Sequence, residues 1–284
     1  MYEQHFQLQE KPFSLLPDPS YLYLSEIHRT ALAVLEYGLN DQAGFTVVSG
    51  EIGCGKTTLV RHLLDRIDAA ITIGLMTSTY QSVDDILQWV LLAFDIESPR
   101  LEKAERVRIF ENFVRSKYAQ KQRTVLIVDE AQNLGTKALE ELRMLSNINV
   151  GKDHMFQLIL LGQPELVATL QLPELCQFAQ RVSVDYFIET LTEKETTAYV
   201  RHRISQAGGA RSIFRNNSYP AIFNYSRGVP RLINLICDTA LVYAFGNRRK
   251  TVTADIVERV IAEKMGKHRI WRTGESTPAP TGRN

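Results

Sequence analysis

The sequence VVSGEIGCGKTTLVRHLL, residues 47–64, carries the most specific pattern in this chain of 284 residues. A short apolar run leads into a glycine-rich turn, and the apolar residues after the turn have helical spacing. Residues 50–57, GEIGCGKT, match the pattern G-x-x-x-x-G-K-[ST] at every fixed position. Glycines let a backbone curl so that successive N–H groups face a phosphate, and the positive end of the next helix adds to that field. The stretch therefore predicts a strand, a phosphate-binding turn and a helix.

The same turn predicts how a magnesium nucleotide is held. We expect Lys56 to reach the β- and γ-phosphates and Thr57 to place its hydroxyl on Mg²⁺. Cys54 occupies a variable position of the pattern, where redox sensing is the alternative to a plain loop residue. The residues expected to contact the nucleotide are Gly50, Glu51, Ile52, Gly53, Cys54, Gly55, Lys56, Thr57, Thr58 and Asp129.

A second apolar run, TVLIVDEAQN at residues 124–133, ends on two adjacent carboxylates. We expect Asp129 to hold Mg²⁺ together with Thr57, and Glu130 to orient and activate the attacking water. Two acids after a strand can also be an ordinary solvated strand end, but here they accompany the glycine turn. Adjacent acids favour an ATPase over a small GTPase, because the second carboxylate supplies the water-activating role.

The composition is that of an ordinary globular protein, with 44% hydrophobic and 23% charged residues and a formal net charge of +1. Cys54, Cys176 and Cys237 lie far apart, which argues against a disulfide framework or a zinc site and suits a reducing cytosol. The N-terminus lacks a basic start followed by an apolar core, so we expect no signal peptide. The apolar runs are shorter than the ~20 residues that span a bilayer. We expect a cytoplasmic protein, recruited to the inner membrane only through a partner.

Strands and helices are expected to alternate up to about residue 190. The patterns predict four strands, at residues 45–50, 70–76, 124–132 and 156–162. The helix expected after the second strand begins with Ser82 as its N-cap. After residue 190 only helices are expected, the first with a capping box from Thr192 to Glu195. The alternation is typical of a parallel sheet covered on both faces, so we predict an α/β core with a C-terminal all-helical lid.

The chain is expected to have four segments. They are an N-terminal lead-in at 1–24, the P-loop nucleotide-binding core at 25–190, the helical lid at 191–268, and a proline-rich, disordered tail at 269–284. From Thr190 onward there are 16 Lys and Arg against 7 Asp and Glu, a balance of +9, so the preceding residues carry −8. The basic lid could track DNA or face the acidic core of a neighbouring subunit, and the opposite charges favour assembly. Its candidate residues are Arg201, Arg203, Arg211, Arg215, Arg248, Arg249 and Lys250.

Beyond these motifs the chain resembles the AAA+ ATPases, and within them the ExeA type, which includes the secretion-pathway ATPase and the MSHA pilus protein MshM. The resemblance runs from Phe6 to about Met265 and rests on the two nucleotide motifs together with EKPFSLLPDPSYLYLSEIHRTAL, LEELRMLSN, LLGQPEL, QRV, YVRHRISQAGG and GVPRLINLICDTAL. Tyr23 and His28 resemble the adenine-side lead-in, with core packing as the alternative. ExeA continues into a transmembrane helix and a peptidoglycan-binding module, neither of which is present in this sequence, so we expect no direct cell-wall binding.

The resemblance implies roles for four further residues. Gln163 occupies the position of the first sensor, which hydrogen-bonds the water or the γ-phosphate, and Arg231 occupies that of the second sensor. Arg181 resembles the arginine finger that enters the neighbouring subunit, and Arg143 is a second interface candidate. A surface ion pair is the alternative for both arginines. The residues expected in catalysis are Glu130, Arg181, Gln163 and Arg231.

The resemblance also implies a function. It implies an AAA+ ATPase that hydrolyses Mg-ATP fully only in a ring or filament of its own copies. The work is expected to be the assembly of a secretion machine or a type IV, MSHA-like pilus, with an inner-membrane component as partner. Because the family shades into ATPases that load on DNA, a DNA-binding regulator of transposition or replication is the alternative. A nucleotide-gated scaffold with little turnover is a third interpretation, against which Glu130 and Arg181 count.

Overall fold

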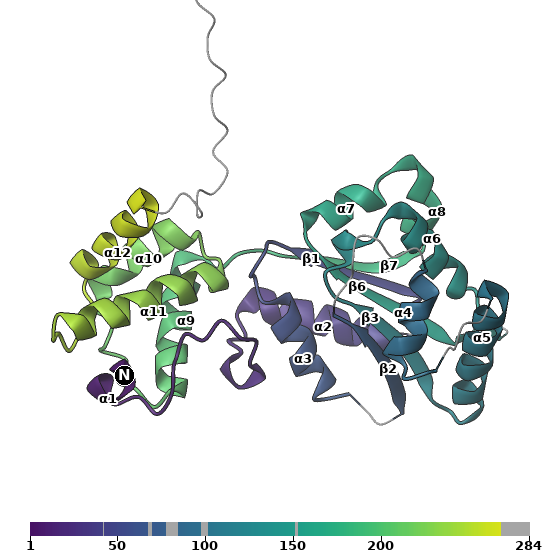
Figure 1. Cartoon of the computed structure of the whole chain (residues 1–284), viewed down its shortest axis with the longest axis horizontal. Coiled ribbons are helices and arrows are strands. Elements are labelled where there is room, and N and C mark those ends of the chain that lie inside the picture. Colours follow the sequence, from purple (N-terminus) through teal and green to yellow (C-terminus); the bar gives the residue numbers. More distant parts are fainter. Residues whose placement is uncertain (42, 68–69, 78–84, 98–101, 151–152, 268–284) are drawn as a thin grey trace, which may run out of the picture. The chain divides into compact units, whose positions relative to one another are not determined.

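The chain divides into two compact units. The computed structural model describes residues 1–41, 43–67, 70–77, 85–97, 102–150 and 153–267. The core unit spans Pro17–Thr190, and the helical unit combines Met1–Leu16 with the chain from Leu191 onward (Figure 1). The residues expected as one lead-in are therefore shared between the two units. The tail expected at 269–284 lies outside the described residues.

A five-stranded sheet forms the centre of the core unit, with the strand order β2-β3-β6-β1-β7 and parallel pairing throughout. The strands are β1 Phe45–Gly50, β2 Ile71–Met76, β3 Arg123–Val128, β6 Phe156–Gly162 and β7 Val182–Ile188. The four strands expected from the sequence are found, but the third, expected at 124–132, ends at Val128 and is followed by a 3₁₀ segment at Ala131–Asn133. Strand β7 was not expected, because its burial alternates and its polar residues interrupt the apolar run that marks the other strands.

Helices cover both faces of this sheet (Figure 1). Those of the core unit are α2 Glu26–Asn40, α3 Lys56–Leu64, α4 Ile86–Ala93, α5 Lys103–Ala119, α6 Thr136–Leu145, α7 Pro164–Leu170 and α8 Cys176–Ala179. A short hairpin, β4 Asn149–Val150 and β5 Asp153–His154, precedes β6. The expected cap at Ser82 is wrong, since α4 begins later with Asp85, whose side chain accepts from the Gln88 N–H. Ser82 itself lies outside the described residues.

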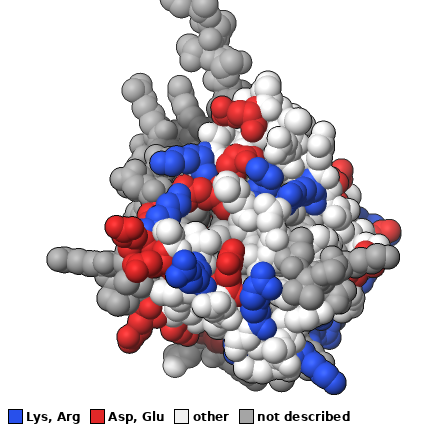
Figure 2. All heavy atoms as spheres, turned by 90° about the vertical axis from the view of Figure 1, so that its right-hand side faces the viewer, with Lys and Arg blue, Asp and Glu red and all other residues white. Residues whose placement is uncertain are grey.

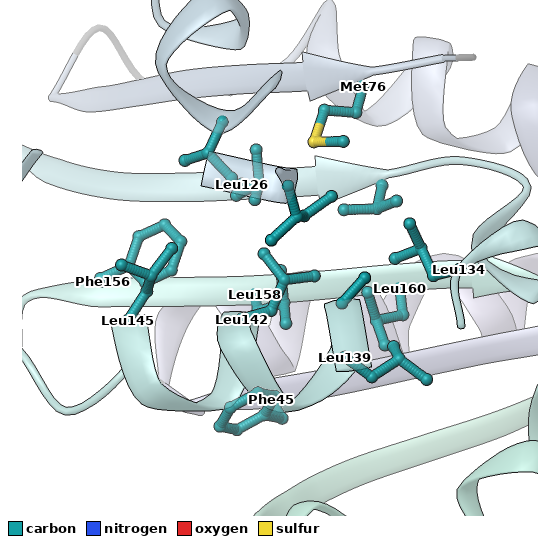
Figure 3. Close-up of a cluster of buried hydrophobic side chains, with 14 of the residues drawn as sticks. Phe45, Met76, Leu126, Leu134, Leu139, Leu142, Leu145, Phe156, Leu158 and Leu160 are labelled. Atoms are coloured by element: carbon teal, nitrogen blue, oxygen red, sulfur yellow. The ribbon is translucent and has the colours of Figure 1, made fainter. Parts of the chain in front are cut away.

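The sheet separates two apolar clusters because successive side chains of a strand point to opposite faces. In β1, Val47 belongs to the cluster on the side of α4 to α6, while Val48 belongs to the cluster with α2 and α3. Figure 3 shows the first cluster, in which Leu139 and Leu142 of α6 lie against Leu158 and Leu160 of β6. Burial on both faces explains why β1, β3 and β6 read as continuous apolar runs.

The helical unit contains five α-helices among its described residues. They are α1 Tyr2–Phe6, α9 Glu193–Gln206, α10 Tyr219–Ser226, α11 Pro230–Gly246 and α12 Ala254–Lys267. The capping box from Thr192 to Glu195 forms as expected at the start of α9. Helix α1 was not expected from the sequence, and it is fixed to α11 by a hydrogen bond from the Tyr2 hydroxyl to Asp238. No helix in the described ranges is both long enough and apolar enough to cross a membrane.

Candidate functional site

The carboxyl ends of the parallel strands place the predicted site residues at one edge of the sheet. The glycine-rich loop follows β1, Asp129 and Glu130 follow β3, and Gln163 follows β6. Since β6 lies between β3 and β1, these three loops are neighbours. Ligands bind at this edge in open α/β sheets.

The loop leads directly into α3 and leaves its first N–H groups without a side-chain cap. Gly55 occupies the N-cap position in the left-handed region, with φ of 100°, which side chains adopt only with strain. The first N–H groups of a helix have no partner within the helix, and together with the helix dipole they favour an anion. The local backbone thus has the form that the sequence predicts for a phosphate-binding turn.

Lys56 is folded into this loop rather than extended into solvent. Its side chain is only 6% exposed, and Nζ donates to the carbonyl oxygens of Gly50 at 2.6 Å and of Glu51 at 3.0 Å. A buried ammonium group needs such partners to offset its lost hydration. Its positive charge is therefore held in the curl of the loop, where the sequence predicts the phosphates.

The two predicted Mg²⁺ ligands meet in the structure although 72 positions separate them. The Thr57 hydroxyl donates to Asp129 Oδ2 at 2.6 Å, and Asp129 Oδ1 accepts the Glu130 N–H at 3.0 Å. Burial raises the pKa of the Asp129 carboxyl above its ordinary value, and the charge of Glu130 contributes to the rise. A hydroxyl and a carboxylate are the hard oxygen donors that Mg²⁺ takes alongside phosphate oxygens and waters. No cluster of three or more His, Cys, Asp or Glu suited to a metal occurs among the described residues.

Glu130 and Gln163 are also brought together. The Gln163 side-chain amide donates to Glu130 Oε2 at 3.0 Å, and Gln132, which sequence reasoning missed, donates to the same oxygen at 2.6 Å. Glu130 has a left-handed backbone, with φ of 56°. Such a conformation costs a non-glycine residue about 1–2 kcal/mol and persists where its surroundings enforce it. The sequence signal for Gln132 was only its place two residues beyond the second acid.

His28 braces the glycine-rich loop from α2. Its ring nitrogens lie 2.8 Å from Ser25 Oγ and 2.8 Å from the Cys54 carbonyl oxygen, and the residue is 4% exposed. A carbonyl oxygen only accepts, so Nε2 carries the proton and donates to it. His28 thus contacts the backbone of the glycine-rich loop. The buried thiol of Cys54 has its pKa raised by burial, which makes the free thiolate scarce and argues against redox sensing.

Arg181 lies at the amino ends of the strands, on the side of the sheet opposite to the glycine-rich loop. It directly precedes β7, whose first residue Val182 pairs with Phe45, whereas the loop begins beyond Gly50, which pairs with Ile188. Six residues of strand correspond to about 20 Å, so Arg181 does not reach the glycine-rich loop of its own chain.

The Arg181 side chain lines a hollow of about 330 Å³. It donates to Ser146 Oγ at 3.1 Å and to the Arg143 carbonyl oxygen at 3.4 Å. Arg143 itself forms an ion pair with Glu140 at 2.8 Å, as in the alternative weighed for it. The hollow is also lined by Gly44, Phe45, Asn147, His154, Gln180 and Ser183.

Arg231 belongs to the helical unit. It is the second residue of α11 and is exposed. The structure thus brings Lys56, Thr57, Asp129, Glu130 and Gln163 together at one edge of the core unit, while Arg181 lies at the other edge and Arg231 lies in the other unit. The roles of these two arginines remain predictions.

Comparisons with known proteins agree with this arrangement. Residues 39–170 match the AAA domain family. The chain is 39% identical over 261 residues to the general secretion pathway protein A of Aeromonas hydrophila, a match that covers 90% of this chain and 47% of that protein. The chain therefore spans about half the length of this relative.

Solved structures show the same fold at low sequence identity. The ORC2 protein of Aeropyrum pernix has a TM-score of 0.66 at 16% identity, covering 90% of this chain and 72% of the other. A Drosophila ORC structure bound to DNA has a TM-score of 0.68 at 18% identity, covering 92% of this chain and 66% of the other. A parallel sheet with flanking helices and a mostly helical C-terminal part is common to these folds, as predicted for the AAA+ class. The chain thus contains a segment, residues 39–170, that matches the AAA domain family, it has the fold of the ORC structures, and it is similar along most of its length to general secretion pathway protein A.

Proposed function

We propose that this chain binds and hydrolyses Mg-ATP, and that it does so in a homo-oligomer that drives or regulates assembly of a secretion or MSHA-like pilus machine. The 2.6 Å contact between Thr57 and Asp129 carries the proposal, because it joins the glycine-rich loop to the end of β3 through the two groups suited to Mg²⁺. The relation to a general secretion pathway protein supports the cellular setting. The proposed location is the cytoplasm, with recruitment by an inner-membrane component.

The proposed mechanism divides the work among five side chains. Lys56, whose ammonium group is held by the carbonyl oxygens of Gly50 and Glu51, exchanges these partners for the β- and γ-phosphate oxygens when ATP binds. Thr57 and Asp129 would hold Mg²⁺, which would neutralise charge on the phosphates. Glu130 orients and deprotonates the attacking water, and Gln163, already hydrogen-bonded to Glu130, contacts the water or the γ-phosphate.

The position of Arg181 supports an oligomer, because it lies at the amino ends of the strands and does not reach the glycine-rich loop of its own chain. If its guanidinium stabilises charge on a γ-phosphate, that phosphate must belong to a second copy. A trans-acting arginine of this kind is worth about 10³–10⁵ in rate in phosphoryl transfer. We propose the second copy as the partner that completes the site, in a ring or a filament.

The test of the proposal separates nucleotide binding from cleavage. Lys56→Ala is expected to abolish ATP binding, while Glu130→Gln is expected to bind ATP and fail to cleave it. Lys137→Ala, which replaces a lysine of α6 outside the site, is the matched control and should leave both unchanged. Binding is measured with a fluorescent ATP analogue and cleavage by phosphate release. Cleavage by Glu130→Gln at the wild-type rate would show that another group activates the water, and a wild-type chain that binds but never cleaves ATP would favour the scaffold interpretation.

A DNA-stimulated ATPase is the second candidate, and one feature of the helical unit favours it. Arg201, Arg211 and Arg215 line a hollow of about 580 Å³ together with Ser212, Phe214, Asn216 and Asn217. The Arg201 guanidinium stacks on Tyr219 at 5.3 Å and donates to Asn216 at 3.0 Å, both uncharged. Among the described residues, no carboxylate forms an ion pair with any of these three arginines.

Two other arginines of the basic set named from the sequence, Arg203 and Arg249, are bonded to partners in the chain. Arg203 is 7% exposed and donates to the Pro12 carbonyl oxygen, so it supports the fold and not a surface. Arg249 pairs with Asp255 at 2.6 Å.

Substituting Arg201, Arg211 and Arg215 with glutamine should therefore remove any DNA stimulation of hydrolysis, while Arg248→Gln/Arg249→Gln should keep it. Binding to phosphates falls steeply with salt because counterions are released. Oligomers that form without DNA, and hydrolysis indifferent to DNA, favour the secretion-type function.

A further inference from the structure

Gln132 lies between the two groups expected to handle the attacking water. It is the middle residue of a short 3₁₀ segment, Ala131–Asn133, that follows β3, and it is half-buried. Its amide nitrogen donates to Glu130 Oε2 at 2.6 Å, and its amide oxygen accepts the backbone N–H of Gln163 at 3.0 Å. With the 3.0 Å bond from the Gln163 side chain to the same Oε2, the three residues close a ring of hydrogen bonds.

The orientation of the Gln132 amide follows from its two partners. A backbone N–H can only donate and an ionised carboxylate can only accept, so a flipped amide would oppose two donors at one end and two acceptors at the other. The ring therefore has one consistent arrangement. Two amide donors converge on one carboxylate oxygen, and the second of them is tied to the first through the backbone of Gln163.

We propose that Gln132 is a positioning residue for the proposed hydrolysis: it fixes the carboxylate of Glu130 and couples it to Gln163. Glu130 follows the strand end on a left-handed backbone, so no regular element orients its side chain. The torsion that turns a carboxylate about its last bond is broad, and two donors on Oε2 restrict it. Misplacement of a general base by about 1 Å can cost on the order of a hundredfold in rate. The inference rests on the proposed ATPase function and adds a residue to it.

A merely structural role for Gln132 makes different predictions. If its amide only stabilised the 3₁₀ segment, its loss would weaken the neighbourhood of β3 and lower nucleotide affinity and thermal stability together. If it positions Glu130, its loss lowers kcat while ATP affinity is kept, because Lys56 and Thr57 belong to a different segment, the start of α3. Asn133 is the matched control, since it belongs to the same segment and takes no part in the ring.

The experiment compares Gln132→Ala, Gln132→Asn and Asn133→Ala in the full chain. We expect Gln132→Ala to lower kcat by about tenfold to a hundredfold, the range for losing a hydrogen bond to a charged group, with the Kd for a fluorescent ATP analogue within about twofold of wild type. Gln132→Asn, one methylene shorter, should reach only one partner and fall between Gln132→Ala and wild type. Asn133→Ala should match wild type. Assembly is checked by size-exclusion chromatography in each case, so that kcat is compared between equal oligomers.

A double-mutant cycle with Gln163→Ala tests the coupling. If both residues act through Glu130, Gln132→Ala/Gln163→Ala should lose less than the product of the single losses. Unchanged kcat in Gln132→Ala, independent losses in the cycle, or equal losses of affinity and kcat would each overturn the positioning role while leaving the ATPase proposal intact. A wild-type chain without ATP binding or hydrolysis would contradict the proposed function itself, and the inference with it.

Discussion

At the scale of single residues, the glycine-rich loop depends on a histidine outside it. His28 holds the Cys54 carbonyl through Nε2 and is itself fixed by the Ser25 hydroxyl. A glutamine at position 28 can place an amide donor near the position of Nε2, whereas alanine leaves the carbonyl without that partner. The buried contact thus links the start of α2 to the conformation of the loop.

We expect His28→Ala to lower ATP affinity by about tenfold, because losing a buried hydrogen-bond partner costs about 1–3 kcal/mol and loosens the loop. His28→Gln should recover most of that affinity. Glu26→Ala, an exposed substitution in the same helical turn, is the control. Titration with a fluorescent ATP analogue measures all three. Equal affinities for the alanine variant and wild type would show that the loop keeps its shape without this contact.

Asp129 gives a prediction for stability against pH. Its pKa is raised in the folded chain because burial disfavours the charged form. The folded state therefore binds a proton more readily than the unfolded state, and stability falls as the pH rises from the ordinary value of 3.8 through the raised one. At neutral pH the charged carboxylate thus lowers the stability of the folded chain.

Asp129→Asn is expected to raise the melting temperature at pH 7 and to abolish hydrolysis. The Thr57 hydroxyl can reverse and accept from an amide, so the contact at the strand end survives the substitution. Thermal unfolding at pH 7 and near pH 4 measures the effect, and the gain should shrink at the lower pH. A variant less stable than wild type at both values would show that the hydrogen bonds to Asp129 outweigh the cost of burying its charge.

At the scale of elements, the start of α11 in the helical unit requires a glycine at position 228. Gly228 has φ of 78°, and a Cβ placed on it would lie 1.8 Å from the Leu191 carbonyl oxygen. The Leu191 N–H donates to the Gly228 carbonyl oxygen at 3.0 Å, so the two backbones are in direct contact. The turn that starts α11 therefore accepts no side chain at this position.

Gly228→Ala should destabilise the chain by at least about 1–2 kcal/mol, the cost of the left-handed backbone alone, with the clash added to it. Gly246→Ala is the matched control, since Gly246 ends the same helix and a methyl group added there would meet no atom within 4 Å. That substitution should be neutral or slightly stabilising, because alanine is the better helix former. Urea unfolding gives both values. Equal midpoints for the two variants would contradict the close approach to Leu191.

Three of the strands that the sequence predicted, β1, β3 and β6, are buried on both faces. Strands β1, β3 and β6 are central, so their residues are apolar with little interruption. Strand β7 is at the edge of the sheet and exposes Asp185 and Phe187, which makes its pattern resemble a loop. Helix α1 is too short for a helical period to be visible. Its packing on α11 stabilises it.

At the scale of the whole molecule, charge is less segregated on the core unit than its sum suggests. Figure 2 shows a face of the molecule on which acidic and basic side chains are interspersed. Two of the ion pairs in the core unit join Lys103 to Glu141 and Arg106 to Asp85. Lys103 is exposed, while Glu141 and both residues of the second pair are half-buried. Ion pairs at the surface contribute about 0–1 kcal/mol to stability. If the basic helical unit contacts the core unit of a neighbouring copy, it must therefore contact a small acidic patch, because the core unit is not acidic over this whole face.

The position of Arg181 gives a prediction about assembled chains. If the arginine acts in the site of a neighbouring copy, as proposed, Arg181→Ala should bind ATP normally and hydrolyse it slowly. Mixed with Lys56→Ala chains, it should regain part of the activity, since hybrid interfaces combine an intact loop with an intact arginine. Phosphate release at several mixing ratios measures this. A mixture that co-assembles without any recovery would show that Arg181 acts within its own chain or only through its contact with Ser146.

The sequence alone determined the glycine-rich turn, the acidic strand end, four of the five strands of the large sheet and the change to helices after residue 190. These features are local in the chain: a run of adjacent residues sets the apolar pattern, the glycine positions and the helix caps. The contacts of Thr57 with Asp129, of His28 with Cys54 and of Gln132 with Gln163 were decided only by the tertiary structure. Each joins residues distant in sequence. The contacts of Thr57 with Asp129 and of Gln132 with Gln163 depend on the strand order β2-β3-β6-β1-β7, which sets which loops lie side by side. The parallel pairing of the strands places Arg181 at the far edge, because their carboxyl ends gather on one side and their amino ends on the other.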